Sequence, residues 1–180
     1  METKVTEEIW KEGIRNLNEK RAISPTFERR QNDAPAITDY ENHLKKIKIG
    51  ESLLDVGCGD CSIRKYLPLT TTYTGIDAFP INDIAIKAKI EELESSDNSF
   101  DTVVCFACLD GCQDLDKAID NMKRIAKKNI YILTGIDIKV DKYHTFSISK
   151  KYLTDKFMDM EIGHEEMLHP KVLLIEFRKP

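Results

Sequence analysis

A short apolar segment that runs into an acid and two glycines constrains the fold of this chain more than any other feature. The segment is 52–56, it contains Asp55, and the turn Gly57-Cys58-Gly59 follows at once. A second apolar segment ends in Asp77, eighteen residues after the second glycine. Glycines let the backbone approach a ligand closely, and the later carboxylate can accept from two ribose hydroxyls. The pattern therefore predicts a nucleoside pocket at the ends of two strands.

The charge beside this turn distinguishes between classes of nucleoside. Dinucleotide-binding turns have a third glycine or an alanine where this chain has Ser62, and they place a helix N-terminus against a pyrophosphate. Asp55 lies two residues before the turn, and a buried carboxylate beside a pyrophosphate would cost free energy. The ammonium of an amino-acid moiety would instead be stabilised there. The pattern favours S-adenosylmethionine over a nicotinamide cofactor.

From residue 50 to residue 126 the chain resembles the class I (Rossmann-like) S-adenosylmethionine-dependent methyltransferases, especially the small metabolite-type group. Three segments carry the resemblance: the glycine turn with its strand at 53–59, the strand end Thr74-Gly75-Ile76-Asp77, and the segment 90–105. The segment 115–128 is similar to the helix that these proteins place before their fifth strand. These motifs cover somewhat less than half of the chain and are specific to the superfamily, but not to any substrate.

The resemblance implies a role for each residue around the turn. Asp55 would lie near the amino group of the cofactor, and Asp77 would hold the ribose hydroxyls. The other implied cofactor-binding residues are Gly57, Cys58 and Gly59 against methionine and ribose, Ala78 and Phe79 beside adenine, Ile90 and Glu91 at its edge, and Cys105 and Phe106, with Ala107, on its other side.

Two positions depart from the family pattern. Lys89 stands where many relatives have an aspartate that accepts a hydrogen bond from the adenine amino group. Because lysine has no acceptor, Glu91 or a backbone carbonyl would have to substitute for it. Cys61 stands in place of a common glycine and narrows the loop slightly.

Alternating apolar strands and helices predict an α/β fold: a doubly wound, mostly parallel seven-stranded sheet in three α/β/α layers. We expect strands near 52–56, 73–76, 102–105 and 130–134, and helices near 62–67, 81–89 and 115–126. A helix near 149–157 then precedes strands at 158–168 and 171–178, which form a C-terminal antiparallel hairpin. Residues 1–48 are expected to form an N-terminal helical cap or lid, with helices at 6–20 and 38–47, on a core at 49–180 in a single domain.

The chemistry of methyl transfer needs few catalytic groups, because a methyl on a sulfonium is already activated and mainly requires alignment. If the acceptor is a hydroxyl, a base would help, and the candidates are His144 and Asp110. The alternatives are an exposed loop histidine and a turn-forming Asp-Gly pair. Trp10 is expected to anchor the first helix by packing, and the other three histidines are expected at the surface or in packing.

Five cysteines include two pairs, Cys58-x-x-Cys61 and Cys105-x-x-Cys108, with Cys112 nearby. Such pairs are typical of zinc sites, but the gap between them exceeds the usual spacing, and Cys58 lies in the cofactor turn. We therefore predict small buried thiols and no metal, with a metal or redox role as the alternative.

Composition and charge limit the partners and the cellular location that we expect. With 27 Lys and Arg against 31 Asp and Glu, the formal net charge is −4, and no basic block indicates a nucleic-acid partner. The N-terminus leads into no apolar run, so neither a signal peptide nor a membrane span is expected. Free cysteines with no sign of secretion favour a cytoplasmic location.

These observations predict a cytoplasmic S-adenosylmethionine-dependent methyltransferase that transfers a methyl group to a small-molecule or compact acceptor by direct displacement. One alternative is a catalytically inactive nucleoside-binding or protein-partner subunit of the same fold. Another is a protein or RNA methyltransferase. The sequence identifies neither the acceptor and its reacting atom nor the oligomeric state.

Overall fold

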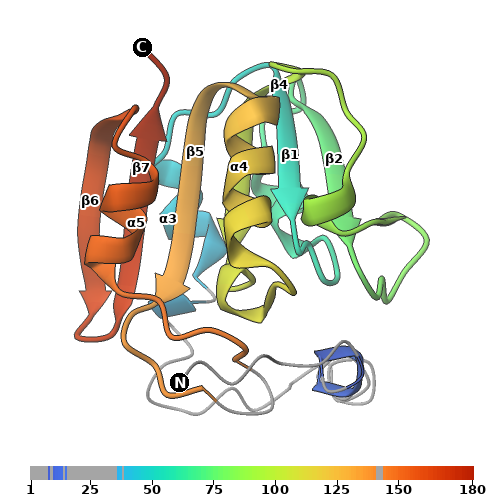
Figure 1. Ribbon diagram of the computed structural model, residues 1–180. Helices are drawn as coiled ribbons and strands as arrows, with labels where there is room; N and C mark the ends of the chain where they lie inside the picture. The colour runs from blue at the N-terminus through green and yellow to red at the C-terminus, as the bar shows by residue number, and fades with distance from the viewer. Residues whose placement is uncertain (1–7, 9, 14, 16–35, 38, 141–143) are drawn as a thin grey trace.

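The computed structural model describes residues 8, 10–13, 15, 36–37, 39–140 and 144–180, and they contain a seven-stranded sheet (Figure 1). Its strand order is β3-β2-β1-β4-β5-β7-β6. Neighbours from β3 to β5 are parallel, whereas β7 is antiparallel to both β5 and β6. The strands are β1 (Ser52–Val56), β2 (Thr72–Asp77), β3 (Ile86–Lys87), β4 (Phe100–Phe106), β5 (Ala126–Gly135), β6 (Glu161–His169) and β7 (Val172–Arg178). The predicted sheet and its C-terminal hairpin are confirmed.

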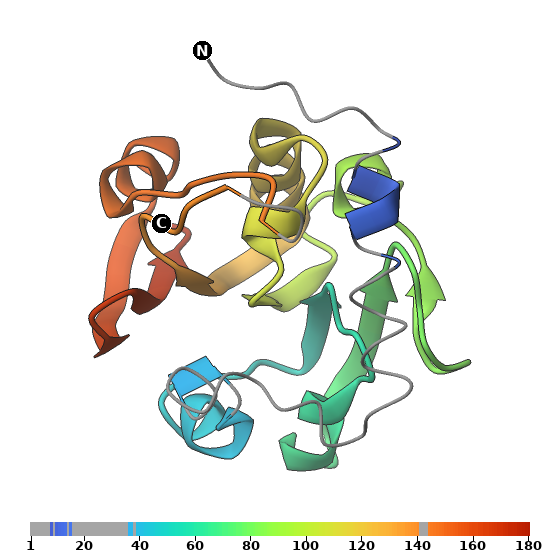
Figure 2. The same ribbon diagram turned by 90° about the horizontal axis from the view of Figure 1, so that it is seen from below.

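Helices cover both faces of the sheet (Figure 2). One face is covered by α4 (Leu115–Ile125) and α5 (Lys150–Lys156), and the other by α3 (Tyr40–Lys45) and the 3₁₀ turn η1 (Ser62–Tyr66). Even positions of β1, such as Leu54, belong to the core under α4, while Leu53 belongs to the core under α3. This alternation follows from the two-residue period of a strand, and it places Asp55 on the α3 face.

Side-chain caps explain where α3, α4 and α5 begin. Asp114 accepts from the Lys117 amide at 3.1 Å at the start of α4, and Ser149 accepts from the Tyr152 amide at 3.1 Å at the start of α5. Asp39 caps α3 at the Asn42 amide. Thr38, the cap expected from the sequence, lies outside the described residues, as does most of the helix expected at 6–20; residues 8, 10–13 and 15 are helical.

The helix expected at 81–89 is absent: the described chain has turns there, followed by the short strand β3. The Asn82 side chain explains the difference, because its Oδ1 accepts from the amides of Ile84 at 3.0 Å and Ala85 at 3.2 Å. Such local bonds compete with helical ones. Ile86 then pairs with Ile76 and adds a seventh strand to the six whose positions were expected.

The helix expected at 62–67 is reduced to the 3₁₀ turn η1. Its first flanking residue, Cys61, has φ of 60°, and no side chain caps the turn. Pro68 follows Leu67 and favours the extended conformation seen there, with ψ of 151°. The crossover from β1 to β2 is therefore a compact turn.

The remaining connections include η2 (Ile90–Glu92) before β4 and η3 (Leu109–Gly111) after it. Strand β6 begins at Glu161, three residues later than expected, because the chain after α5 forms a turn first. In the part of the chain that the structure describes, no helix is long and apolar enough to span a bilayer.

Candidate functional site

The glycine turn links the ends of β1 and β2. The amides of Gly57 and Cys58 both donate to the Ile76 carbonyl, at 2.9 and 3.0 Å. Gly57 has φ of +69° and Gly59 has φ of +54°, which is the left-handed region where glycine carries no steric penalty. A Cβ on Gly57 would also lie 2.1 Å from the Cys108 sulfur. The turn is therefore held close to the loop after β4.

Asp77, at the end of β2, holds this turn through its carboxylate. Its Oδ2 accepts from the Gly59 amide at 3.0 Å, and its Oδ1 accepts from the Phe79 amide at 2.8 Å. The residue is only 8% exposed. Because a carboxylate oxygen can accept more than one hydrogen bond, these two amide bonds do not by themselves exclude a ligand hydroxyl.

Asp55 is buried one strand away, with its Oδ2 accepting from the Tyr73 hydroxyl at 2.8 Å. Burial raises the pKa of Asp55 to about 7, against the lowering effect of that hydrogen bond, and the nearby Cys108 and Asp77 raise it further. A cation beside Asp55 would offset the cost of its charge. Sequence reasoning missed Tyr73; the signal was Gly75, which lies opposite Asp55 in the sheet and leaves room for a side chain to reach across.

The residues expected around adenine differ in their burial and in their hydrogen-bond partners. Ala78 and Phe79 are half-buried directly after Asp77. Ile90 is buried in the core, and its carbonyl accepts from the Asn121 side chain at 2.6 Å. The Glu91 carboxylate accepts from the amides of Gln113 at 2.7 Å and Asp114 at 3.2 Å, before α4. Glu91 therefore already serves the start of that helix.

Lys89, the first departure noted in the sequence, acts only as a hydrogen-bond donor in these contacts, as the chemistry of an ammonium group requires. Its ammonium donates to Glu92 at 2.5 Å and to the Gln113 side chain at 3.0 Å. The other departure, Cys61, takes a left-handed φ that explains why glycine is common at this position.

The end of β4 lies beside the turn. Cys105 is fully buried, and Phe106 is 6% exposed at the last position of the strand. Ala107 then has φ of 55°, an unusual conformation for a residue with a side chain, and its amide donates to the Leu133 carbonyl at 2.7 Å. The ring of Phe106 stacks with Tyr40 and meets the edge of the His43 ring.

All five cysteines are free thiols. The sulfurs of Cys58 and Cys61 are 3.6 Å apart, and burial raises the pKa of the Cys58 thiol. Cys108 lies in hydrogen-bond contact with both Cys105 and Cys112, and those contacts together with burial raise the pKa of both partners. Among the described residues, no group of three or more histidine, cysteine or acidic side chains is arranged to hold a metal ion.

The two catalytic candidates lie together. His144 follows β5 and Asp110 lies in η3 after β4, and His144 Nε2 is 3.6 Å from Asp110 Oδ2. Backbone contacts fix this arrangement: the amides of Thr145 and Phe146 both donate to the Asp110 carbonyl, at 2.8 and 3.1 Å. The sequence named these residues separately and did not predict their contact.

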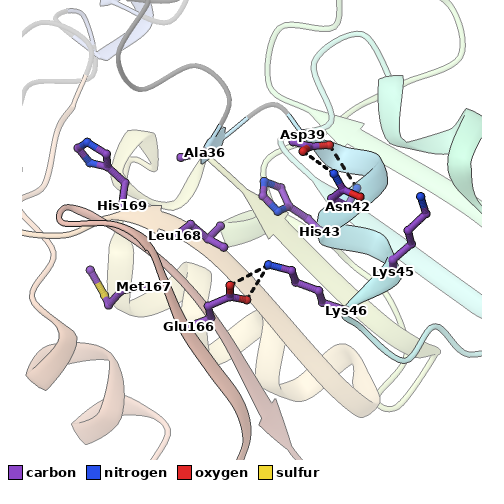
Figure 3. Close-up of a pocket in the computed structure, with 10 residues that line it drawn as sticks. All are labelled: Ala36, Asp39, Asn42, His43, Lys45, Lys46, Glu166, Met167, Leu168 and His169. Atoms are coloured by element: carbon purple, nitrogen blue, oxygen red, sulfur yellow. Dashed lines mark hydrogen bonds and ion pairs between the residues drawn. The ribbon is translucent and has the colours of Figure 1, made fainter.

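A separate cavity of about 700 Å³ lies between α3 and the β6–β7 hairpin (Figure 3). His43 lines it from α3 and His169 from the hairpin, and Lys46 pairs with Glu166 across it at 2.8 Å. His43, expected at the surface or in packing, is 3% exposed, and burial lowers the pKa of its ring. The cavity contains neither of the two carboxylates at the glycine turn.

Comparison with known proteins supports the fold and a methyltransferase domain. Residues 54–134 match the family model described as a methyltransferase domain. No curated protein sequence matches the chain significantly.

Three solved structures illustrate the similarity of fold. An S-adenosylmethionine-dependent methyltransferase from Aquifex aeolicus is 17% identical, with 82% of this chain and 93% of that chain covered and a TM-score of 0.64. The 1,6-didemethyltoxoflavin-N1-methyltransferase of Burkholderia thailandensis, solved with 1,6-didemethyltoxoflavin and S-adenosylhomocysteine, is 11% identical, with 97% and 90% covered and a TM-score of 0.69. The [4+2]-cyclase SpnF is 16% identical, with 83% and 82% covered and a TM-score of 0.64.

At these identities the solved structures establish the fold, and the family model adds the domain. The match over 54–134 includes the glycine turn and Asp77, and the observed strand order is consistent with it. Residues 54–134 of this chain match a methyltransferase domain, and the chain has the fold of the S-adenosylmethionine-dependent methyltransferases.

Proposed function

We propose that this protein binds S-adenosylmethionine at the glycine turn and transfers its methyl group to a small-molecule or compact acceptor. The observation that carries the proposal is the Asp77 carboxylate, which is fixed by the Gly59 and Phe79 amides at the end of β2. A carboxylate fixed at that point of a parallel sheet suits ribose hydroxyls. The Burkholderia neighbour, whose structure holds S-adenosylhomocysteine and a small heterocycle, supports the same class of ligand.

Asp55 fits the amino-acid end of this cofactor. It is a buried carboxylate whose pKa is raised to about 7, so burial disfavours its charged form despite the hydrogen bond from Tyr73. The ammonium of the methionine moiety would supply the missing positive charge. Ala78 and Phe79 would border the adenine, and Gly57, Cys58 and Gly59 would lie against the rest, with Cys105 and Phe106 closing the opposite side.

The bound cofactor supplies an activated methyl on a positively charged sulfur. The protein then has to align the acceptor with that methyl and exclude water. Where the acceptor must lose a proton, His144 would take it on Nδ1, because Nε2 faces Asp110, and the Asp110 carboxylate would stabilise the imidazolium that forms. An acceptor that is already nucleophilic would need only the alignment.

The alternative function is binding of the nucleoside at the glycine turn without methyl transfer. Glu91, the side chain expected to replace the missing adenine acceptor, is engaged by the amides before α4. SpnF has this fold and is a cyclase, so the fold also occurs with other chemistry. A panel of small acceptors, followed by detection of S-adenosylhomocysteine, separates an enzyme from a binding subunit.

Asp77→Ala tests the proposed ribose contact. We expect it to weaken S-adenosylhomocysteine binding by about tenfold to a hundredfold, because hydrogen bonds to a charged group contribute about 1.5–3 kcal/mol. The matched control is Asp83→Ala, an exposed acid six residues further along the chain, which should bind normally. Isothermal titration calorimetry measures both. Equal affinity in the two variants, with folding verified by circular dichroism, would show that Asp77 does not hold the nucleoside.

A further inference from the structure

Trp10 lies against three parts of the candidate site. Its indole is 4% exposed, and Nε1 donates to the Gly111 carbonyl at 2.7 Å. Its ring centroid is 5.7 Å from that of Phe79, with the planes tilted by 51°, and the Lys89 ammonium is 5.5 Å from the ring centroid. The N-terminal helical segment that carries Trp10 lies at the end of the sheet where β1 and β2 finish (Figures 1 and 2). The contacts therefore connect an element remote in sequence with the loops after β2 and β4.

These loops are the ones that the proposed function assigns to adenine. Phe79 is tied to the proposed ribose site, because its amide donates to Asp77 Oδ1 at 2.8 Å. Lys89 stands at the position where an adenine partner is expected, and Gly111 ends η3 beside Asp110. The indole therefore lies where a base attached to a ribose at Asp77 would be expected.

An indole offers this surface the same kinds of contact as adenine. Both are flat bicyclic rings that can stack on an aromatic side chain, and both carry an N–H that can donate to a backbone carbonyl. Resting on the proposed function, we infer that Trp10 occupies the adenine subsite in the free protein and that the nucleoside must displace it. Trp10 thereby sets the affinity for the cofactor, a role beyond the packing expected from the sequence.

Displacement has a measurable cost. Cofactor binding must break the Gly111 hydrogen bond and separate the indole from Phe79 and Lys89. A variant without the indole avoids this cost, so Trp10→Ala should bind S-adenosylhomocysteine about tenfold more tightly than the natural chain. If Trp10 instead stacked on the bound adenine, its removal would weaken binding. The two arrangements predict opposite signs.

Tryptophan fluorescence reports on Trp10 directly, because Trp10 is the only tryptophan in the sequence. S-adenosylhomocysteine is titrated into the full chain while tryptophan emission is recorded, and calorimetry measures the affinity of the same samples. We expect the emission to move to longer wavelength as the indole leaves its buried place, with the same dissociation constant as the calorimetric one. The matched control is Glu12→Ala, an exposed acid on the same helical segment, which should behave like the natural chain.

The outcomes distinguish this inference from the function on which it rests. Equal or weaker binding by Trp10→Ala, or an emission maximum that does not move to longer wavelength at saturation, overturns the displacement. If neither the natural chain nor Trp10→Ala binds, the proposed function itself fails. Should Trp10→Ala prove unfolded by circular dichroism, Trp10→Phe decides: it keeps a ring but loses the donor to Gly111, and it should bind about threefold more tightly.

Discussion

The two halves of the sheet are built differently. In the half formed by β1, β2 and β3, the connections are turns and the short η1, and the backbone is left-handed at Gly57, Gly59 and Cys61. In the half formed by β4, β5, β7 and β6, α4 and α5 cover an apolar core in which Phe157 and Phe177 stack with centroids 4.0 Å apart. Left-handed residues and buried carboxylates also occur in the second half, at Asn98, Ala107 and Asp137 and at Asp101, Asp110 and Glu176, but there Lys128 and Arg178 pair with the Asp101 and Glu176 carboxylates. The first half instead concentrates its left-handed residues in one turn beside two buried carboxylates, Asp55 and Asp77. Strained backbone and buried charge reduce stability, and they persist where they serve a ligand.

This contrast assigns different tasks to the two halves. The turn half is expected to bind the cofactor, while the helix-covered half supplies stability and, at the tips of β4 and β5, the His144–Asp110 pair. Three predictions test this division of tasks.

The largest expected effect is on turnover. His144→Ala should lower kcat by about a hundredfold or more for an acceptor that must lose a proton, because general bases contribute about 10²–10⁴. S-adenosylhomocysteine affinity should stay unchanged, since His144 lies outside the turn half. Steady-state kinetics and calorimetry measure the two quantities. His164→Ala, on β6, is the control and should retain both. A loss of affinity in His144→Ala as large as in Asp77→Ala would contradict the division of tasks.

The next effect compares two glycines, one from each half. Gly57→Ala should lower the free energy of unfolding by about 2–3 kcal/mol, because the new Cβ would clash with Cys108 at a left-handed φ. Gly135→Ala, in β5, should cost less than about 1 kcal/mol, since the added Cβ meets the flexible end of Ile138. Urea unfolding measures both. Equal costs would show that the turn is no more constrained than a regular strand.

The smallest effect concerns pH. The pKa of Asp55 is raised to about 7 in the folded chain, so the stability that its neutral form contributes is present at low pH and is lost as pH rises through 7. Cofactor binding should favour the charged form. Affinity for S-adenosylhomocysteine should therefore rise about fivefold between pH 6 and pH 7, with release of a proton.

Asp55→Asn isolates this contribution from that of other groups that titrate in the same range. The variant should show a flatter affinity profile and, at pH 8, a higher unfolding temperature, because it buries no charge. Calorimetry in buffers of different ionisation enthalpy counts the released protons. A natural chain that releases no proton at pH 7 would place the ammonium of the cofactor away from Asp55.

Local patterns predicted much of this molecule. Alternating strands, the glycine turn and the acid at Asp77 are encoded within short segments, and they occur close to where they were expected, although β5 begins four residues earlier and β6 three residues later. The prediction of a helix at 81–89 was wrong, because the side chain of Asn82 accepts hydrogen bonds from the amides that would lie in its first turn. The roles of the candidate cofactor residues stay predictions.

Contacts between distant segments could not be predicted in the same way. The pairing of His144 with Asp110, the use of Glu91 by the start of α4, and the position of Trp10 against Gly111 each join elements far apart in sequence. Spacing within one element says nothing about such contacts, because they depend on how the loops at the strand ends pack.

The central claim is that the glycine turn and its two carboxylates bind S-adenosylmethionine. Its most direct test is a calorimetric titration of the full, folded chain with S-adenosylmethionine at pH 7.5. The account predicts saturable binding at one site per chain. Absence of heat and of any thermal shift at millimolar cofactor, in the natural chain and in Trp10→Ala alike, would contradict it.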